Sequence, residues 1–171
     1  LGVIYFKKAN YVDSSAAFNF IIENFPQSRF RESSINQTAR CYIQQLKFLE
    51  ATAVLKNLNE STGAIALERD YLRGYALWQL KDFEKALVLF ELCINNESDR
   101  FKEEASYNKV NCLSESAISD KAFTEALKFL KASPESVYLA DTQYLAGINA
   151  EKLKNLKEAE KYFRLSLKSY T

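Results

Sequence analysis

Histidine is absent from this sequence of 171 residues, and glycine and proline are scarce. Without histidine the chain has no imidazole general base, no histidine ligand for a metal ion and no Ser-His or Cys-His nucleophile pair. Only 4 glycines and 2 prolines are present, which is too few turn-forming residues for the many hairpins of an all-β protein. The sequence therefore excludes most familiar enzyme designs and indicates a helical fold.

Cysteine is also rare. The 3 cysteines, Cys41, Cys93 and Cys112, lie 52 and 19 residues apart and form no C-x-x-C pair. An odd number of widely spaced cysteines is not the pattern of a disulfide framework or of a zinc site. Their neighbours are typical of helix interiors, where a free cysteine behaves as a small hydrophobic residue. We expect three buried thiols, no metal site and no bound cofactor.

An excess of charge of one sign is lacking as well. The 23 basic and 22 acidic residues leave a net charge of +1, so no global field attracts nucleic acid or an anionic membrane. No run approaches the roughly 20 apolar residues of a membrane-spanning helix. With 47% hydrophobic and 26% charged residues, the composition is that of a folded chain. We therefore expect neither nucleic-acid binding nor a membrane span.

What the sequence does contain is a repeat. A small residue followed four positions later by a bulky apolar residue occurs five times, and the small residues are 37, 35, 40 and 33 positions apart. Four of the five have a second small residue 12 positions before them. Two small sites per unit indicate two helices that cross closely, because a small side chain lets helix axes approach. The pairs are Ser14/Phe18, Ala51/Leu55, Ala86/Phe90, Ala126/Leu130 and Ala159/Phe163, and the upstream small residues are Gly2, Ala39, Gly74 and Gly147.

Longer matches occur where a new unit begins. Residues 29–32 match residues 100–103 over a shift of 71, and residues 26–30 share a Pro-x-Ser-x-aromatic pattern with residues 134–138 over a shift of 108. Proline cannot continue the preceding helix, and serine can cap the amide groups at the start of the next one. Both matches therefore predict the start of a first helix.

These features together resemble the tetratricopeptide repeat, whose family pattern has Leu-Gly-x-x-Tyr in the first helix and Ala-x-x-x-Phe in the second. The segment Leu1-Gly2-x-x-Tyr5 matches that pattern literally. The fourth unit departs from it, with Val110 at the small site and four extra residues near 116–121, and we expect a looser helix crossing there. The resemblance implies an all-α fold, a right-handed superhelical solenoid of about five helix-turn-helix repeats.

The resemblance covers the whole chain as a single array. It divides the chain into repeats at residues 1–27, 28–63, 64–98, 99–133 and 134–171. The expected helices span 1–25 with a break near Asn10, 30–46, 48–60, 65–80, 82–95, 101–115, 120–132, 136–153 and 155–169. Because Leu1 falls midway through a first helix of the family pattern, and no polar cap follows the last helix, we expect the parent protein to continue at one or both ends.

The Pro-x-Ser-x-aromatic pattern is similar to that of tetratricopeptide repeats in bacterial envelope proteins, including outer-membrane assembly lipoproteins. This similarity favours a bacterial protein of the periplasm or cell envelope, whereas the unpaired cysteines fit a reducing cytosol equally well. The compartment and the organism stay open.

In this family the first helix of each repeat lines a concave face that binds partners. The resemblance therefore implies a partner-binding groove, with its residues taken position by position from the family pattern. They are Val3, Phe6, Asn36, Arg40, Ile43, Tyr71, Tyr75, Trp78, Tyr107, Asn111, Tyr144 and Ile148. The clamp of Lys, Asn and Arg with which some members grip a terminal carboxylate is not matched, since only Asn36 and Arg40 could bind an anion.

Three of these residues form an aromatic stripe on one helix, because Tyr71, Tyr75 and Trp78 are spaced 4 and 3 positions apart. An aromatic stripe on a helix usually packs in the hydrophobic core. Another stripe of the same helix, which includes Gly74 and Leu77, already supplies its packing residues, and tyrosine and tryptophan are enriched in binding hot spots. We predict that the aromatic stripe lies in the groove, with a place in the core as the alternative.

The sequence thus predicts a non-catalytic scaffold that binds a protein or peptide partner in its groove. One alternative is a structural spacer, or a segment that self-associates through its uncapped ends. A nucleic-acid-binding helical repeat is a further alternative, which the balanced charge disfavours. Nothing in the sequence identifies the partner.

Overall fold

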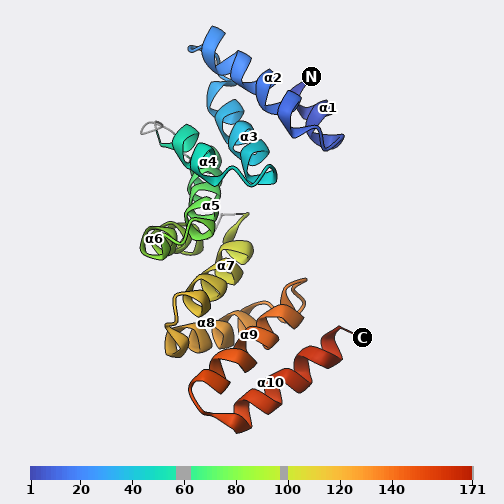
Figure 1. Ribbon diagram of the computed structural model, residues 1–171, viewed down its shortest axis with the longest axis vertical. Coiled ribbons are helices and arrows are strands. Elements are labelled where there is room, and N and C mark those ends of the chain that lie inside the picture. Colours follow the sequence, from blue (N-terminus) through green and yellow to red (C-terminus); the bar gives the residue numbers. More distant parts are fainter. Residues whose placement is uncertain (57–62, 97–99, 171) are drawn as a thin grey trace. The chain divides into compact units, whose positions relative to one another are not determined.

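A computed structural model describes residues 1–56, 63–96 and 100–170. Within these ranges the regular structure is helical throughout and includes no strand (Figure 1), which confirms the all-α prediction. The helices are α1 (Gly2–Lys7), α2 (Tyr11–Asn24), α3 (Arg31–Gln44), α4 (Phe48–Leu55), α5 (Gly63–Gln79), α6 (Phe83–Ile94), α7 (Lys102–Glu115), α8 (Ser119–Ala132), α9 (Leu139–Lys152) and α10 (Leu156–Ser169).

The helix bounds follow the sequence pattern closely. The break expected near Asn10 separates α1 from α2. The helix expected over 136–153 begins later, at Leu139, because the residues before it form a turn. The helix expected over 48–60 extends to Leu55 as α4, and the last part of that expectation, 57–60, lies outside the described residues.

The chain divides into two compact units, Leu1–Leu92 and Cys93–Thr171. In the first unit α1 packs on α2, α2 on α3, α3 on α4 and α4 on α5. In the second unit α7, α8, α9 and α10 pack in the same successive manner. First helices of neighbouring hairpins also touch, α3 against α5 in the first unit and α7 against α9 in the second. Each unit therefore presents a surface built from adjacent first helices.

The same turn recurs between paired helices. Among the described residues, five that are not glycine adopt a positive φ between 56° and 65°. In each case the next residue donates its backbone N–H to a carbonyl five residues before it, as Asn10 does to Tyr5 at 3.0 Å, the bond of a Schellman helix end. The five are Ala9, Leu46, Lys81, Ala117 and Lys154, at steps of 37, 35, 36 and 37. One such turn falls in each predicted repeat, while the residue boundaries between repeats stay a prediction.

Close helix crossings lie where the small residues predict them. A methyl group added at Gly2 would come within 2.8 Å of Phe18 Cζ, and one added at Gly147 within 2.5 Å of Phe163 Cδ1. Each phenylalanine is the bulky member of the pair predicted for the second helix of that repeat. The absence of a side chain at the glycine therefore makes room for the ring of the facing helix.

The other small sites are buried as well. Ala39, Ala51, Ala86 and Ala126 are fully inaccessible to solvent. In the fourth repeat Val110 replaces the small residue, and it is equally buried in a cluster with Ala126 and Ala146. The valine is thus accommodated in the core, and a looser crossing at this repeat stays a prediction.

All three cysteines are free and buried, which confirms the predicted thiols. The Cys41 thiol donates to Ser14 Oγ at 3.2 Å, and Ser14 Oγ in turn donates to the Gly2 carbonyl at 2.9 Å. Burial raises the pKa of the Cys41 thiol above its ordinary value. These hydrogen bonds link α1, α2 and α3, and the thiol that takes part in them stays protonated and unreactive.

The two Pro-x-Ser-x-aromatic segments form the same structure before α3 and α9. Ser28 Oγ accepts a hydrogen bond from the Phe30 N–H at 3.2 Å, and Ser136 Oγ accepts one from the Tyr138 N–H at 3.0 Å. Serine therefore satisfies a backbone amide next to the start of each helix, as its position in the sequence predicts.

Candidate partner-binding groove

A hollow of about 240 Å³ lies on the first helices of the first unit. α1, α3 and α5 all contribute to its wall. The residues that line it are Phe6, Arg40, Ile43, Gln44, Tyr71, Leu72 and Tyr75. Five of the seven belong to the predicted groove set, and sequence reasoning did not include Gln44 and Leu72. The structure therefore brings together groove residues from three predicted repeats.

An ion pair lies beside this hollow. Arg40 Nε on α3 donates to Glu68 Oε1 on α5 at 2.7 Å. The Glu68 side chain is only 11% exposed, while that of Arg40 is 31% exposed. Glu68 precedes Tyr71 by one turn on the same helix. The guanidinium is thus neutralised within the protein, and the sequence analysis missed its partner carboxylate.

Asn36 does not line an open groove. It is 1% exposed, and its Nδ2 donates to the Ile65 carbonyl on α5 at 3.0 Å. Its side-chain oxygen is also buried and has no hydrogen-bond partner among the described residues. The expectation of an accessible Asn36 is wrong, because the contact between α3 and α5 encloses this side chain. Its amide instead links the two helices.

The aromatic stripe of α5 divides between surface and core. Tyr71 and Tyr75 are half-buried and line the hollow, whereas Trp78 is buried. The rings of Tyr75 and Trp78 meet edge to face, with centroids 5.5 Å apart. The placement of Trp78 in the groove is therefore corrected to the core.

The four groove residues predicted in the second unit lie on α7 and α9. Tyr107 stacks on Tyr138, with ring centroids 4.4 Å apart and an interplanar angle of 12°. Asn111 donates from its side chain to the Tyr107 carbonyl at 3.1 Å. Tyr144 is 51% exposed, and Ile148, one turn further along α9, is half-buried. These residues form a tyrosine-rich surface.

An aspartate, Asp141, lies close to Tyr107 on this surface. Burial raises the pKa of Tyr107, and Asp141 raises it further through its charge and a hydrogen bond. The hydroxyl of Tyr170, at the end of α10, donates to the Asp141 carboxylate, which raises the pKa of that tyrosine too. Asp141 therefore lies within reach of tyrosines from α7 and α10. Sequence reasoning did not include it.

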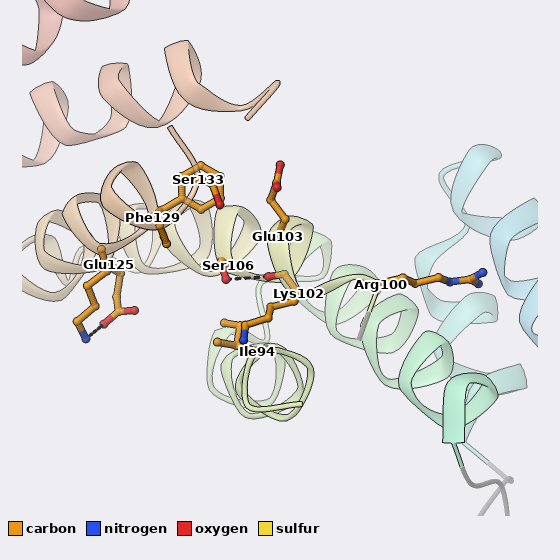
Figure 2. A pocket seen from close by; sticks show the side chains of 10 residues that line it. Ile94, Arg100, Lys102, Glu103, Ser106, Glu125, Phe129 and Ser133 are labelled. Carbon is orange, nitrogen blue, oxygen red and sulfur yellow. Dashed lines mark hydrogen bonds and ion pairs between the residues drawn. The ribbon is translucent and has the colours of Figure 1, made fainter. Parts of the chain in front are cut away.

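A second hollow in the second unit, of about 590 Å³, lies between the start of α7 and α8. Figure 2 shows Glu125 turned toward a neighbouring amine on the α8 side, with Lys102 and Arg100 on the other side. Glu125 pairs with Lys128 at 2.7 Å and with Lys109 at 2.9 Å. Burial opposes ionisation of Glu125, but these two lysines outweigh it and lower its pKa. The wall of this hollow includes none of the predicted groove residues.

Comparison with known proteins decides the fold family. Residues 71–100 match the family model of the tetratricopeptide repeat. A crystal structure of MamA superposes with a TM-score of 0.84 at 17% identity, over 98% of this chain and 93% of that one. The chain has a tetratricopeptide-repeat fold. No curated protein sequence matches it significantly.

Other solved tetratricopeptide structures agree. A tetratricopeptide repeat protein from Parabacteroides merdae superposes with a TM-score of 0.80 at 15% identity, over 99% of this chain and 64% of that one. A putative kinesin light chain of Podospora anserina, with nearly identical tetratricopeptide-like repeats, gives a TM-score of 0.75 at 10% identity, over 97% of this chain and 89% of that one. At such identities the likeness is one of fold alone.

Among the residues with assigned structure, none of the helices has both the length and the apolar character needed to cross a membrane. The same residues include no cluster of three or more side chains that could hold a metal ion. Tetratricopeptide proteins are generally non-catalytic scaffolds that present surfaces to protein partners.

Proposed function

We propose that this chain is a non-catalytic scaffold that binds a protein or peptide partner on the surface of its first helices. The observation that carries the proposal is the hollow of the first unit, where Phe6, Tyr71 and Tyr75 from two separate helices face a common space. Rigid aromatic side chains supply large contact area at little cost in conformational entropy, and they are common in binding hot spots.

The size of this hollow favours a peptide over a small molecule. Its volume of about 240 Å³ lies below the range of roughly 300–1,000 Å³ that is usual for small-molecule pockets. Such a space suits one or two side chains of a larger partner. Ile43 and Leu72 add apolar wall, so an apolar or aromatic side chain is the expected occupant.

The ion pair of Arg40 with Glu68 argues against capture of a terminal carboxylate at this hollow. Arg40 is already engaged at 2.7 Å by a carboxylate of the protein itself. The second predicted anion-binding residue, Asn36, is buried. The hollow is therefore expected to select its partner by shape and apolar contact.

Selection from a displayed library of random peptides tests the proposal. One class of the peptides that bind the wild-type chain should lose affinity at least about tenfold on Tyr71→Ala/Tyr75→Ala, because truncation of a hot-spot aromatic typically costs about 2 kcal/mol or more. Phe20→Ala removes an exposed aromatic from α2, outside this hollow, and serves as the matched control. Equal binding of every selected peptide by wild type and the double variant would contradict the use of this hollow.

Self-association through the ends of the array is a second candidate. Leu167 on α10 corresponds to Ile22 on α2, since both lie 8 residues after the small residue of their repeat, Ala159 or Ser14. Ile22 packs against the core cluster that contains Ile35 and Ala39 of the next helix, α3. Leu167 has no such cover and is 70% exposed. A second copy could supply the missing contact, and the mass in solution decides this.

A further inference from the structure

One short pattern recurs on three successive first helices. An acidic residue is followed three positions later by tyrosine, as Glu68 and Tyr71 on α5, Glu104 and Tyr107 on α7, and Asp141 and Tyr144 on α9. The acidic residues are 36 and 37 positions apart, which is one repeat each. Residues three apart lie on the same side of a helix. Each of these helices therefore carries a carboxylate next to a tyrosine ring.

In the first unit the acidic residue of this pattern, Glu68, binds a guanidinium group. Glu68 accepts from Arg40 Nε at 2.7 Å, and the guanidinium comes from the preceding first helix, α3. Tyr71, Tyr75 and Arg40 all line the same hollow. A guanidinium beside a carboxylate and aromatic rings is a favourable arrangement, because its planar fork pairs with carboxylate oxygens while its face stacks on rings.

The second unit has the carboxylates but lacks this internal guanidinium. The residue that corresponds to Arg40 is Asn111, by the same shift of 71 that relates Cys41 to Cys112. The Asn111 amide is turned to the backbone carbonyl of Tyr107. Among the described residues, no basic side chain forms an ion pair with Glu104 or Asp141.

The basic residues of α7 and α9 lie elsewhere. Lys109 pairs with Glu125 on α8 at 2.9 Å, and Lys152 Nζ donates to the Ser114 carbonyl at 3.2 Å. Lys102 lines the hollow next to α8. Glu103, next to Glu104, accepts a hydrogen bond from Ser136 rather than from a cation. The tyrosine-rich surface between α7 and α9 is therefore acidic.

We propose that Glu104, Tyr107, Asp141 and Tyr144, the acidic tyrosine face of the second unit, bind an arginine side chain of a basic peptide segment. The partner's guanidinium takes the place that Arg40 fills beside Glu68. The stacked rings of Tyr107 and Tyr138 and the half-exposed ring of Tyr144 provide aromatic surface beside the carboxylates. This inference rests on the proposed scaffold function and adds the chemistry of the partner.

The experiment uses the full chain and the same displayed library of random peptides. Arginine should be enriched among peptides that bind wild type. A selected arginine peptide should lose affinity at least about fivefold when its arginine is replaced by citrulline, which keeps the shape and removes the charge. Glu104→Gln/Asp141→Asn should cause a similar loss, and higher salt should weaken the wild-type complex, since partly exposed charge pairs are screened.

Two further variants make the result specific. Asp120→Asn removes a carboxylate from the exposed start of α8, away from the acidic tyrosine face, and should leave arginine-peptide affinity unchanged. Asn111→Arg places in the second unit the guanidinium that the first unit has at Arg40. It should preserve the melting temperature and abolish binding of the arginine peptide, because the protein's own side chain then occupies the face.

The outcomes separate this inference from the scaffold function. Peptides that depend on Tyr71 and Tyr75 but show no arginine enrichment, and that bind Glu104→Gln/Asp141→Asn normally, would overturn the inference and leave the scaffold function in place. A library that yields no specific binder would contradict both. Arginine peptides that bind Asn111→Arg as well as wild type would place their site elsewhere.

Discussion

At the scale of single residues, burial separates side chains that the helical register places next to each other. Tyr75 lines a hollow, while Trp78, three positions later, is buried, and its indole nitrogen has no hydrogen-bond partner in the described part of the chain. Likewise Arg40 stays partly exposed beside the hollow while it pairs with Glu68, whereas Asn36, one turn before it, is enclosed. The role of each residue thus depends on which neighbouring helix its side chain meets.

Trp78→Ala is expected to destabilise the protein by about 3–5 kcal/mol, because it leaves a large cavity in the core. Tyr71→Ala, at a half-buried surface position of the same helix, should cost clearly less. Chemical denaturation of both variants measures the difference. A small effect of Trp78→Ala would show that the indole is not part of the core.

The cysteines give a second prediction at this scale. A buried thiol with a raised pKa stays protonated at neutral pH, and the thiolate is the reactive form. All three cysteines are buried, and burial raises the pKa of Cys41. Cys41, Cys93 and Cys112 should therefore react slowly with a thiol reagent in the native protein at pH 7.5, and all three should react rapidly in denaturant. Immediate reaction of one or more native thiols would show that the corresponding helix opens.

At the scale of helices, the same turn and the same crossing recur along the chain. The five Schellman turns place a non-glycine residue at positive φ, where a side chain costs about 1–2 kcal/mol. The glycines at helix crossings have the opposite role, since they make room for a ring. Side-chain size at a few positions therefore sets how each pair of helices is joined and how closely it packs.

Ala117→Gly should stabilise the protein by about 0.5–1 kcal/mol, because glycine adopts a positive φ without steric strain. Ala117 is exposed, so its methyl group contributes little packing. The matched control is Ala16→Gly, at an exposed position inside α2, which should destabilise by about 0.5–1 kcal/mol. Opposite shifts in melting temperature are expected, and shifts in the same direction would contradict the turn conformation.

Gly147→Ala should destabilise more than Gly74→Ala. The added methyl group would lie 2.5 Å from the Phe163 ring at position 147, but 3.1 Å from the Phe90 ring at position 74. Overpacking costs about 1–3 kcal/mol, whereas alanine gains about 1 kcal/mol in helix propensity over glycine. The gain should cancel most of the cost at Gly74 but not at Gly147. Urea unfolding of the two variants provides the measurement.

At the scale of the whole molecule, the charge balance and the exposed apolar residues determine which kinds of partner the chain can bind. A net charge of +1 supplies no long-range attraction for nucleic acid. Apolar side chains are exposed on the outer helices, notably Leu1 and Val12 near the start and Leu156 and Leu167 near the end. Scattered exposed apolar residues are normal, but Leu167 lies at the repeat position whose counterpart, Ile22, packs against the next helix.

If the ends self-associate, sedimentation should show a mass that rises with protein concentration. Leu156→Lys/Leu167→Lys should then return the chain to a monomer, because two charges would have to be buried in the contact. The change should leave helicity intact, since both side chains are 70% exposed. Val88→Lys, at an exposed site on α6, is the control. A monomer at all concentrations would remove this candidate.

Much of the fold could be predicted from the sequence because its determinants are local. The spacing of small and bulky residues gives the paired helices, as Gly147 and Phe163 show, and the serine before each of two first helices marks where they start. About half of the predicted groove set also comes together around one hollow. The burial of Asn36 and Trp78 could not be predicted, because a residue's place in the repeat pattern does not determine which side chains of neighbouring helices cover it.

By itself, the sequence determined that the chain forms paired helices with close crossings, buried thiols and no histidine chemistry, because residue size and spacing act within one hairpin. The tertiary structure alone decided which polar side chains meet. The pair of Arg40 with Glu68 joins residues 28 positions apart, and the place of Asp141 among tyrosines depends on three different helices. Such contacts depend on how one hairpin packs on the next, and no local pattern specifies that.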